Sequence, residues 1–212
     1  KEAHILLSSL DKLEAGSLRL AASSSLASFP LMAAFQDKYP GITLSFTATA
    51  LQQLKTGLFS FQSDIMIDDI PAEDDRLFCE KLGTAPLRLA VSKRHPLADR
   101  EAISPKELNG SKLILPCDKE TLLLRPKHWS HKLDHEERRI LQLGNKELAR
   151  EAVAYNLGVS FLTEAEARDD PRICLLELDG VELMEESYLV CLAELRESRL
   201  ISAFFDCAFA SG

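Results

Sequence analysis

The sequence predicts an α/β fold built as two lobes, and three observations lead to this prediction. Segments with the period-two alternation of strands take turns with segments of helical periodicity along most of the chain. The first such group, residues 17–46, is typical of one βαβ unit with parallel strands and a right-handed connection. At 212 residues the chain is long for one core and short for two independent domains.

Predicted strands and helices alternate in the first part of the chain. Residues 4–13 carry leucines on one helical face and are followed by Gly16, a natural stop, so we interpret residues 1–16 as the end of a longer linker helix. The elements that follow are a strand at 18–20, a helix at 28–39, a strand at 42–46, a helix at 51–60, a strand at 64–68 and extended segments at 76–82 and 87–91.

The second part opens on a capping box. Ser104, Pro105 and Glu107 occupy the N-cap, first and third positions of a helical turn. Asn145 is placed to cap a helix over 146–156, and Gly158 is expected to end it. The remaining predicted elements are strands at 112–115, 141–143, 159–162, 173–178 and 187–192 and helices at 121–135, 164–168 and 198–209.

Composition limits the possible functions. The net charge of −8 argues against nucleic-acid binding by this chain, because phosphate contact needs a clustered basic face. The five cysteines are scattered and lack metal-site spacing, which indicates reduced thiols in the cytoplasm. No apolar run approaches about 18 residues, so no transmembrane helix is expected. The chain does not begin with Met, and we expect it to be part of a longer protein.

Polar side chains follow several predicted strands at the point where each strand ends. Ligands of open α/β sheets bind past the carboxyl ends of strands, where helix N-termini converge. Hydroxyls, amides and one lysine in such places suit a small anion. The alternative is that the serines and Asn145 only cap helices. The candidate ligand-binding residues are Ser23, Ser24, Ser25, Thr47, Thr49, Cys117, Lys119, Asn145 and Thr163.

Other chemistry is less well supported. His128, His131 and His135 could share a helix face and bind zinc or copper, but their segment is otherwise densely charged, as a solvated face is. The acidic run from Asp68 to Asp75 lacks the glycine and spacing of a calcium loop and is interpreted as a solvated loop. No catalytic motif is present, so we predict that the chain is not an enzyme and needs no metal or cofactor.

Five stretches, in the same order along the chain, resemble the effector-binding domain of LysR-type transcriptional regulators. They are residues 35–41 (FQDKYPG), 64–67 (DIMI), 87–98 (LRLAVSKRHPLA), 103–108 (ISPKEL) and 152–162 (AVAYNLGVSFL). The sequence departs from the family at Phe61, where a glycine is usual, at Thr163, where a proline is usual, and at Leu51, where a serine or threonine is common.

The resemblance implies a type-2 periplasmic-binding-protein-like fold. Each lobe would be a mixed sheet flanked by helices, and crossing strands would join the lobes. Lobe I would hold residues 17–87 and 193–212 and lobe II residues 88–192. A small-molecule effector would bind in the cleft between them, and DNA would be bound by an N-terminal helix-turn-helix domain that this chain lacks. The alternative function is that of a solute-binding protein of a transporter, which shares the fold but needs a secretion signal.

We also expect a homodimer, with a tetramer possible for the full-length protein. The first predicted helix carries Leu31, Met32 and Phe35, and the helix at 146–156 carries Leu148, Val153 and Tyr155. In the family that this chain resembles, a lobe I helix of one subunit packs beside a lobe II helix of the other. The alternative is that these side chains fill the subunit's own core.

Overall fold

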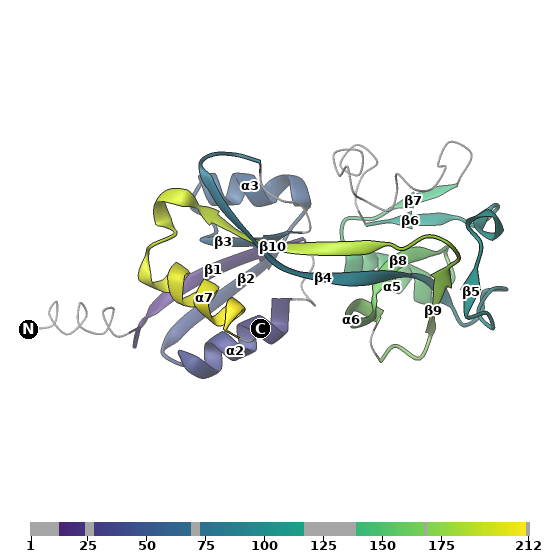
Figure 1. The fold of residues 1–212 in the computed structure, drawn as a ribbon, viewed down its shortest axis with the longest axis horizontal. Helices are drawn as coiled ribbons and strands as arrows, with labels where there is room; N and C mark the ends of the chain where they lie inside the picture. Colours follow the sequence, from purple (N-terminus) through teal and green to yellow (C-terminus); the bar gives the residue numbers. More distant parts are fainter. Residues whose placement is uncertain (1–12, 24–27, 69–72, 117–138, 168, 211–212) are drawn as a thin grey trace, which may run out of the picture. The chain divides into compact units, whose positions relative to one another are not determined.

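The computed structural model describes residues 13–23, 28–68, 73–116, 139–167 and 169–210. It divides the chain into two compact units, unit 1 with residues 1–83 and 186–212 and unit 2 with residues 84–185. The predicted lobes had their boundaries at 87/88 and 192/193. Strands β4 (Leu77–Ser92) and β10 (Met184–Leu192) each carry the chain from one unit to the other (Figure 1). The crossing points therefore lie within strands, where the sequence offers no boundary signal.

The sheet of unit 1 contains the predicted βαβ unit. Strand β1 (Gly16–Ala22) pairs in parallel with β2 (Ile42–Ala48) and with β3 (Ile65–Asp68), and β10 is antiparallel to β3. Among its described residues, this unit contains the helices α2 (Phe29–Lys38), α3 (Leu51–Phe59) and α7 (Arg199–Phe209). The predicted helices at 28–39, 51–60 and 198–209 are confirmed within two residues.

Side-chain alternation buries both faces of this sheet. Leu18 and Leu20 of β1 face one core, with Phe35 of α2 and Phe204 of α7. Ala21 faces a second core, with leucines of α3. Successive strand side chains point to opposite faces, so a central strand needs a helix layer on each side. Helices α2 and α7 cover one face and α3 the other (Figure 1).

Unit 2 repeats this arrangement with different strands. Strand β4 pairs antiparallel with β8 (Ser160–Thr163) and β9 (Ile173–Leu178), and β9 is parallel to β5 (Ala102–Ile103). Strands β6 (Leu113–Leu115) and β7 (Ile140–Gln142) pair in parallel. Its helices are α5 (Lys146–Ala154) and α6 (Glu164–Ala167), and the predicted capping box opens a 3₁₀ helix at Pro105–Leu108.

Two sequence predictions are wrong in detail. The extended segments at 76–82 and 87–91 form the single strand β4, which runs through Pro86. A proline is compatible with a strand where its missing N–H is not needed for pairing. Gly158 does not end α5. The helix ends at Ala154 with Tyr155 as its C-cap, and Asn156 takes the left-handed conformation with φ of 62°.

The end of α5 is a Schellman motif built on asparagine. The N–H of Asn156 donates to the carbonyl of Val153 at 2.8 Å, and that of Leu157 donates to the carbonyl of Ala152 at 3.0 Å. Asparagine tolerates the left-handed region better than most residues. Gly158 has another role, because a Cβ there would lie 2.4 Å from the carbonyl oxygen of Lys112. This glycine allows β8 to approach β6.

The close approach at Gly158 gives a prediction. The Gly158→Ala chain is expected to lose about 1–3 kcal/mol of stability, because the added methyl forces the two backbones apart. Gly144→Ala is the matched control, since a Cβ at Gly144 meets nothing within 4 Å. Urea denaturation of both variants checks this, and equal midpoints would contradict the proposed close contact.

Candidate functional site

Three predicted site residues of unit 1 lie at the carboxyl ends of β1 and β2. The N–H of Thr49 donates to the carbonyl of Ala22 at 3.0 Å, which places Thr49 beside the end of β1, where Ser23 follows. The Thr49 hydroxyl donates to Gln53 Oε1 at 2.6 Å. Thr47 is exposed and pairs in register with Ala21. We call Ser23, Thr47 and Thr49 the unit 1 polar edge.

Asp68 was missed as a member of this region. It ends β3, which runs parallel to β1, so its backbone lies at the same end of the sheet. The interpretation of residues 68–75 as a solvated loop is wrong for Asp68, because this carboxylate is buried. An aspartate directly after an uninterrupted apolar strand was the available signal. Asp74 does lie at the surface, where hydrogen bonds from Arg76 lower the pKa of its carboxyl to about 2.

The predicted residues of unit 2 also gather at carboxyl ends of parallel strands. Strand β7 is parallel to β6, and Val159, directly before β8, forms a parallel bridge with Leu113 of β6. Asn145 follows β7 and Thr163 ends β8. We call Asn145 and Thr163 the unit 2 polar edge.

Both residues of this edge cap helices. Asn145 Oδ1 accepts a hydrogen bond from the N–H of Leu148 at 2.9 Å, which confirms the predicted cap of α5. Thr163 is buried, its Oγ1 accepts from the N–H of Glu166 at 3.3 Å, and its own N–H donates to Glu166 Oε2 at 2.8 Å. The cap of α5 uses Oδ1 of Asn145 and not the amide nitrogen Nδ2, which is a suitable donor to an anion.

Lys146 was not predicted to contribute to the site. Its ammonium lies 2.8 Å from Glu166 Oε1 and also donates to Glu185 Oε1 of β10. We call Lys146, Glu166 and Glu185 the Lys146 cluster. The pattern Thr-x-x-Glu at 163–166 could have indicated the capping box. Nothing in the sequence indicated that Lys146 would contact both Glu166 and Glu185.

Several predicted site residues lie outside the described part of the chain. They are Ser24, Ser25, Cys117 and Lys119. The histidines at 128, 131 and 135 and the helix predicted at 121–135 also lie outside it. Within the described ranges, no group of three His, Cys, Asp or Glu side chains could hold a metal ion.

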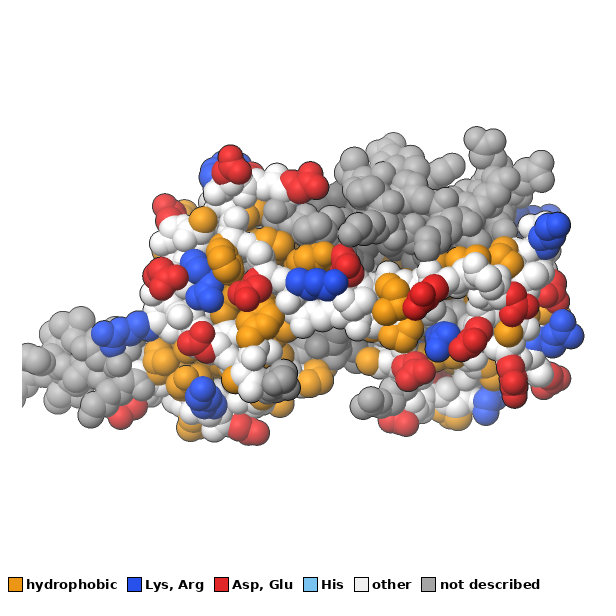
Figure 2. Space-filling view, viewed as in Figure 1, with side chains coloured by type: hydrophobic (Ala, Val, Ile, Leu, Met, Phe, Trp, Pro, Cys, Tyr) orange, Lys and Arg blue, Asp and Glu red, His pale blue; other side chains and the backbone are white. Residues whose placement is uncertain are grey.

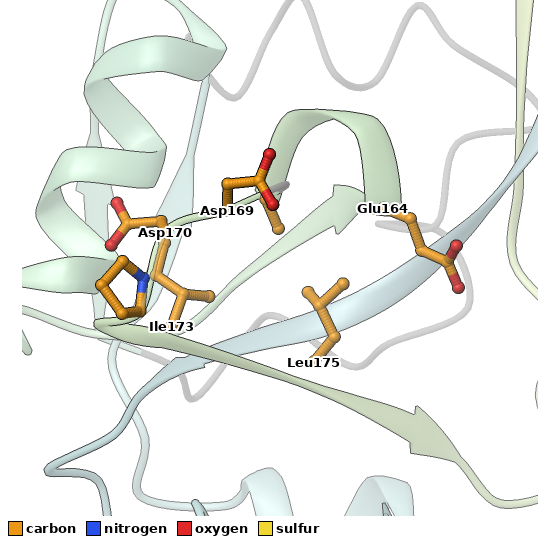
Figure 3. Close-up of a pocket in the computed structure, with 7 residues that line it drawn as sticks. Glu164, Asp169, Asp170, Ile173 and Leu175 are labelled. Carbon is orange, nitrogen blue, oxygen red and sulfur yellow. The ribbon is translucent and has the colours of Figure 1, made fainter.

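A pocket of about 360 Å³ lies beside α6, and the residues that line it are not among those predicted as the site. Figure 3 shows Glu164 and Asp169 on either side of this short helix, with Leu175 of β9 between them. Asp170 also lines the pocket, but its carboxylate binds Arg172 through Nε at 2.9 Å and Nη2 at 2.6 Å. Arg172 in turn binds Glu151 of α5. Ion pairs at the surface, from Asp170 to Arg172 and from Arg172 to Glu151, thus fix the Asp170 side of the pocket.

This network gives a prediction about pH. The hydrogen bonds from Arg172 lower the pKa of the Asp170 carboxyl from 3.8 to about 2. A carboxyl with a lower pKa in the folded state contributes stability above its unfolded pKa and loses it as the pH falls toward the folded pKa. Arg172→Gln should therefore lower the urea midpoint at pH 6, and the difference from the unchanged chain should shrink from pH 4 downward. Arg94→Gln, at another exposed arginine of unit 2, is the control. A pH-independent difference would contradict the prediction.

Comparison with known proteins identifies the family. The family model described as the LysR substrate binding domain matches residues 11–211. The RuBisCO operon transcriptional regulator of Allochromatium vinosum is 27% identical, over 96% of this chain and 69% of that protein.

Two solved structures are similar in fold. The regulatory domain of CcmR from Synechocystis PCC6803, in complex with 2-PG, has a TM-score of 0.73 and 26% identity, over 92% of this chain and 97% of that chain. The effector binding domain of QuiR, in complex with shikimate, has a TM-score of 0.75 and 18% identity, over 93% of this chain and 97% of that chain. The similar proteins are regulators, so the transporter alternative is not supported.

The described residues contain no helix that is both long and apolar enough to cross a bilayer. The type-2 periplasmic-binding-protein-like fold predicted from the sequence is confirmed. From the match over residues 11–211, the chain belongs to the LysR substrate-binding-domain family, which forms the effector-sensing regulatory part of LysR-type transcriptional regulators.

Proposed function

We propose that this domain senses a small anionic metabolite with its two polar edges and thereby controls transcription in the cytoplasm. The observation that carries the proposal is that hydroxyl and amide groups gather at the carboxyl ends of parallel strands in each unit. The CcmR domain was solved with 2-PG and the QuiR domain with shikimate, a carboxylate, which supports an anion as the ligand class.

We assign DNA binding to a helix-turn-helix domain elsewhere in the full-length protein. The Allochromatium vinosum regulator extends beyond the matched 69% of its length, which leaves room for such a domain. The charge of this chain is −8. On the face in Figure 2, basic side chains are interspersed with acidic ones. A scattered arrangement of this kind does not make a phosphate-binding surface. We propose that the role of this domain is to bind the effector and signal its presence, without catalysing a reaction.

Asn145 caps α5 and is also proposed to bind the effector, and two substitutions should separate these roles. Asn145→Asp keeps a capping oxygen but adds a negative charge, so it should retain thermal stability and weaken binding of 2-PG or shikimate at least tenfold. Asn145→Ala should lower stability by about 1 kcal/mol and also weaken binding. Calorimetric titration with both probes and thermal unfolding check this.

The unit 1 polar edge supplies the second arm of the same experiment. Thr49→Ala should weaken binding as well, because we propose that the unit 1 polar edge also binds the effector through its hydroxyl groups. Thr43→Ala is the control, since Thr43 is an exposed residue at the other end of β2. Unchanged affinity in both Asn145 variants would reduce Asn145 to a helix cap. Unchanged affinity in Thr49→Ala would remove the unit 1 polar edge from the proposed effector site.

We also propose that two copies associate through α2 and α5. Phe35 and Val153 do not support this, because both are fully buried in their own unit's core. Leu148 and Tyr155 of α5 are 51% and 65% exposed, and Phe29 of α2 is 49% exposed. A two-fold arrangement uses each apolar patch twice, so a small area counts double.

The dimer proposal is tested at Leu148. Leu148→Asp places a charge on the exposed face of α5 and should leave the chain monomeric at about 100 µM, well above the micromolar Kd of a weak dimer. Met184→Asp is the control, because Met184 is also a partly exposed apolar residue of unit 2. Sedimentation velocity measures both variants. A monomer before any substitution, or dissociation by both variants, would contradict the assignment to α2 and α5.

A further inference from the structure

The Lys146 cluster is a buried group of three charges in unit 2. The side chains of Lys146, Glu166 and Glu185 are only 12%, 4% and 16% exposed. Removing charges from water carries a desolvation penalty that ion pairing often only balances. A lysine in the first turn of a helix is also opposed by the positive end of the helix dipole. A gain in folding stability is therefore a weak explanation for burying these three charges together.

The cluster connects the two helices that open at the unit 2 polar edge. Lys146 is the first residue of α5, directly after the cap Asn145. Glu166 belongs to α6, and its second oxygen accepts the N–H of Thr163 at 2.8 Å. The first residue of α5 thus contacts, through its ammonium, the glutamate of the α6 capping box. An anion bound at Asn145 and Thr163 would be close to this positive charge.

The same ammonium also holds a strand that crosses between the units. Glu185 lies on β10 and is the last residue of unit 2, and Glu186 is the first residue of the second segment of unit 1. Glu186 is held by Lys81 of β4 at 2.8 Å and by the hydroxyl of Tyr188. The two adjacent glutamates of β10 thus bind lysines of different units. Glu186 binds Lys81 of unit 1, and Glu185 binds Lys146 of unit 2.

We propose that Lys146 is a positioning residue that couples the effector edge of unit 2 to the crossing strand β10. An anion at the edge competes with Glu185 for the Lys146 ammonium and so loosens the hold of unit 2 on β10. The inference rests on the proposed effector function, which it deepens by naming the residue through which binding reaches the crossing strand. The ligand class is a carboxylate or phosphate, since either attracts an ammonium.

The coupling itself is measured without any ligand. Hydrogen exchange of the 212-residue chain is followed in peptides that cover residues 184–192 and 173–178. Glu185→Gln leaves the Lys146–Glu166 pair in place and should speed exchange in 184–192 at least fivefold, with 173–178 unchanged. Unchanged exchange in 184–192, or equal acceleration in both peptides, would overturn the coupling. This result does not depend on whether an effector binds.

The competition is measured with 2-PG, shikimate and inorganic phosphate as probes. Glu185→Gln removes the competitor and should tighten binding at least threefold. Lys146→Gln removes the attracted cation and should weaken binding at least tenfold, while Lys146→Arg keeps the charge and should restore most of the affinity. Lys81→Gln breaks the ion pair between Lys81 of β4 and Glu186 of β10 and should leave affinity unchanged. A purely structural cluster would weaken binding in both the Glu185 and Lys146 variants.

The two arms separate the possible failures. If no probe binds the unchanged chain while exchange in 184–192 rises in Glu185→Gln, the coupling stands and the proposed ligand class fails. If Glu185→Gln weakens binding or leaves it unchanged, the competition is wrong whatever the exchange shows. If Lys146→Gln does not fold, Lys146→Arg and Glu185→Gln still decide the proposal, because neither removes the cation.

Discussion

The two buried faces of the central strands are the constraint on which the rest of this structure depends. Leu18 and Leu20 of β1 face one core while Ala21 faces another, and Leu89 and Ala90 of β4 divide in the same way. Strands buried on both faces need helices on both sides, and parallel neighbours need a crossover between them. The helices therefore begin at the carboxyl ends of the strands. This is how Thr49, Asn145 and Thr163 come to lie at strand ends, where we propose that a ligand binds.

The same constraint explains where charge accumulates. Helix N-termini expose N–H groups that attract acceptors, and here they are met by Asn145 Oδ1 and by Glu166 Oε2. Lys146 then provides a cation close to the buried carboxylate of Glu166. At the surface, Arg172 joins Asp170 to Glu151 in a comparable way, but in contact with solvent. Solvent screens the charges of the buried cluster less than it screens those of the surface network.

Two backbone positions show how local chemistry adapts the fold. Phe61 has a φ of 56°, a conformation in which glycine is favoured, and glycine is usual there in the family that the sequence resembles. Arg19 holds this turn, with its guanidinium donating to the Phe61 carbonyl and to both oxygens of Asp64. Asn156 and Gly158 have different functions after α5. Asn156 adopts the left-handed backbone conformation, and Gly158 allows the close contact with the backbone of Lys112.

The sequence by itself determined the order and type of nearly all described elements, the cap at Asn145 and the family. Hydrophobic periodicity and capping are local, so a single chain displays them directly. It also located polar residues at strand ends, because parallel topology places those ends together. Only the tertiary structure decided that Phe35 and Val153 are core, that Asp68 is buried and that Lys146 meets Glu166 and Glu185. These facts depend on contacts between residues distant in sequence, and no local pattern records which of two apolar or charged side chains will be covered.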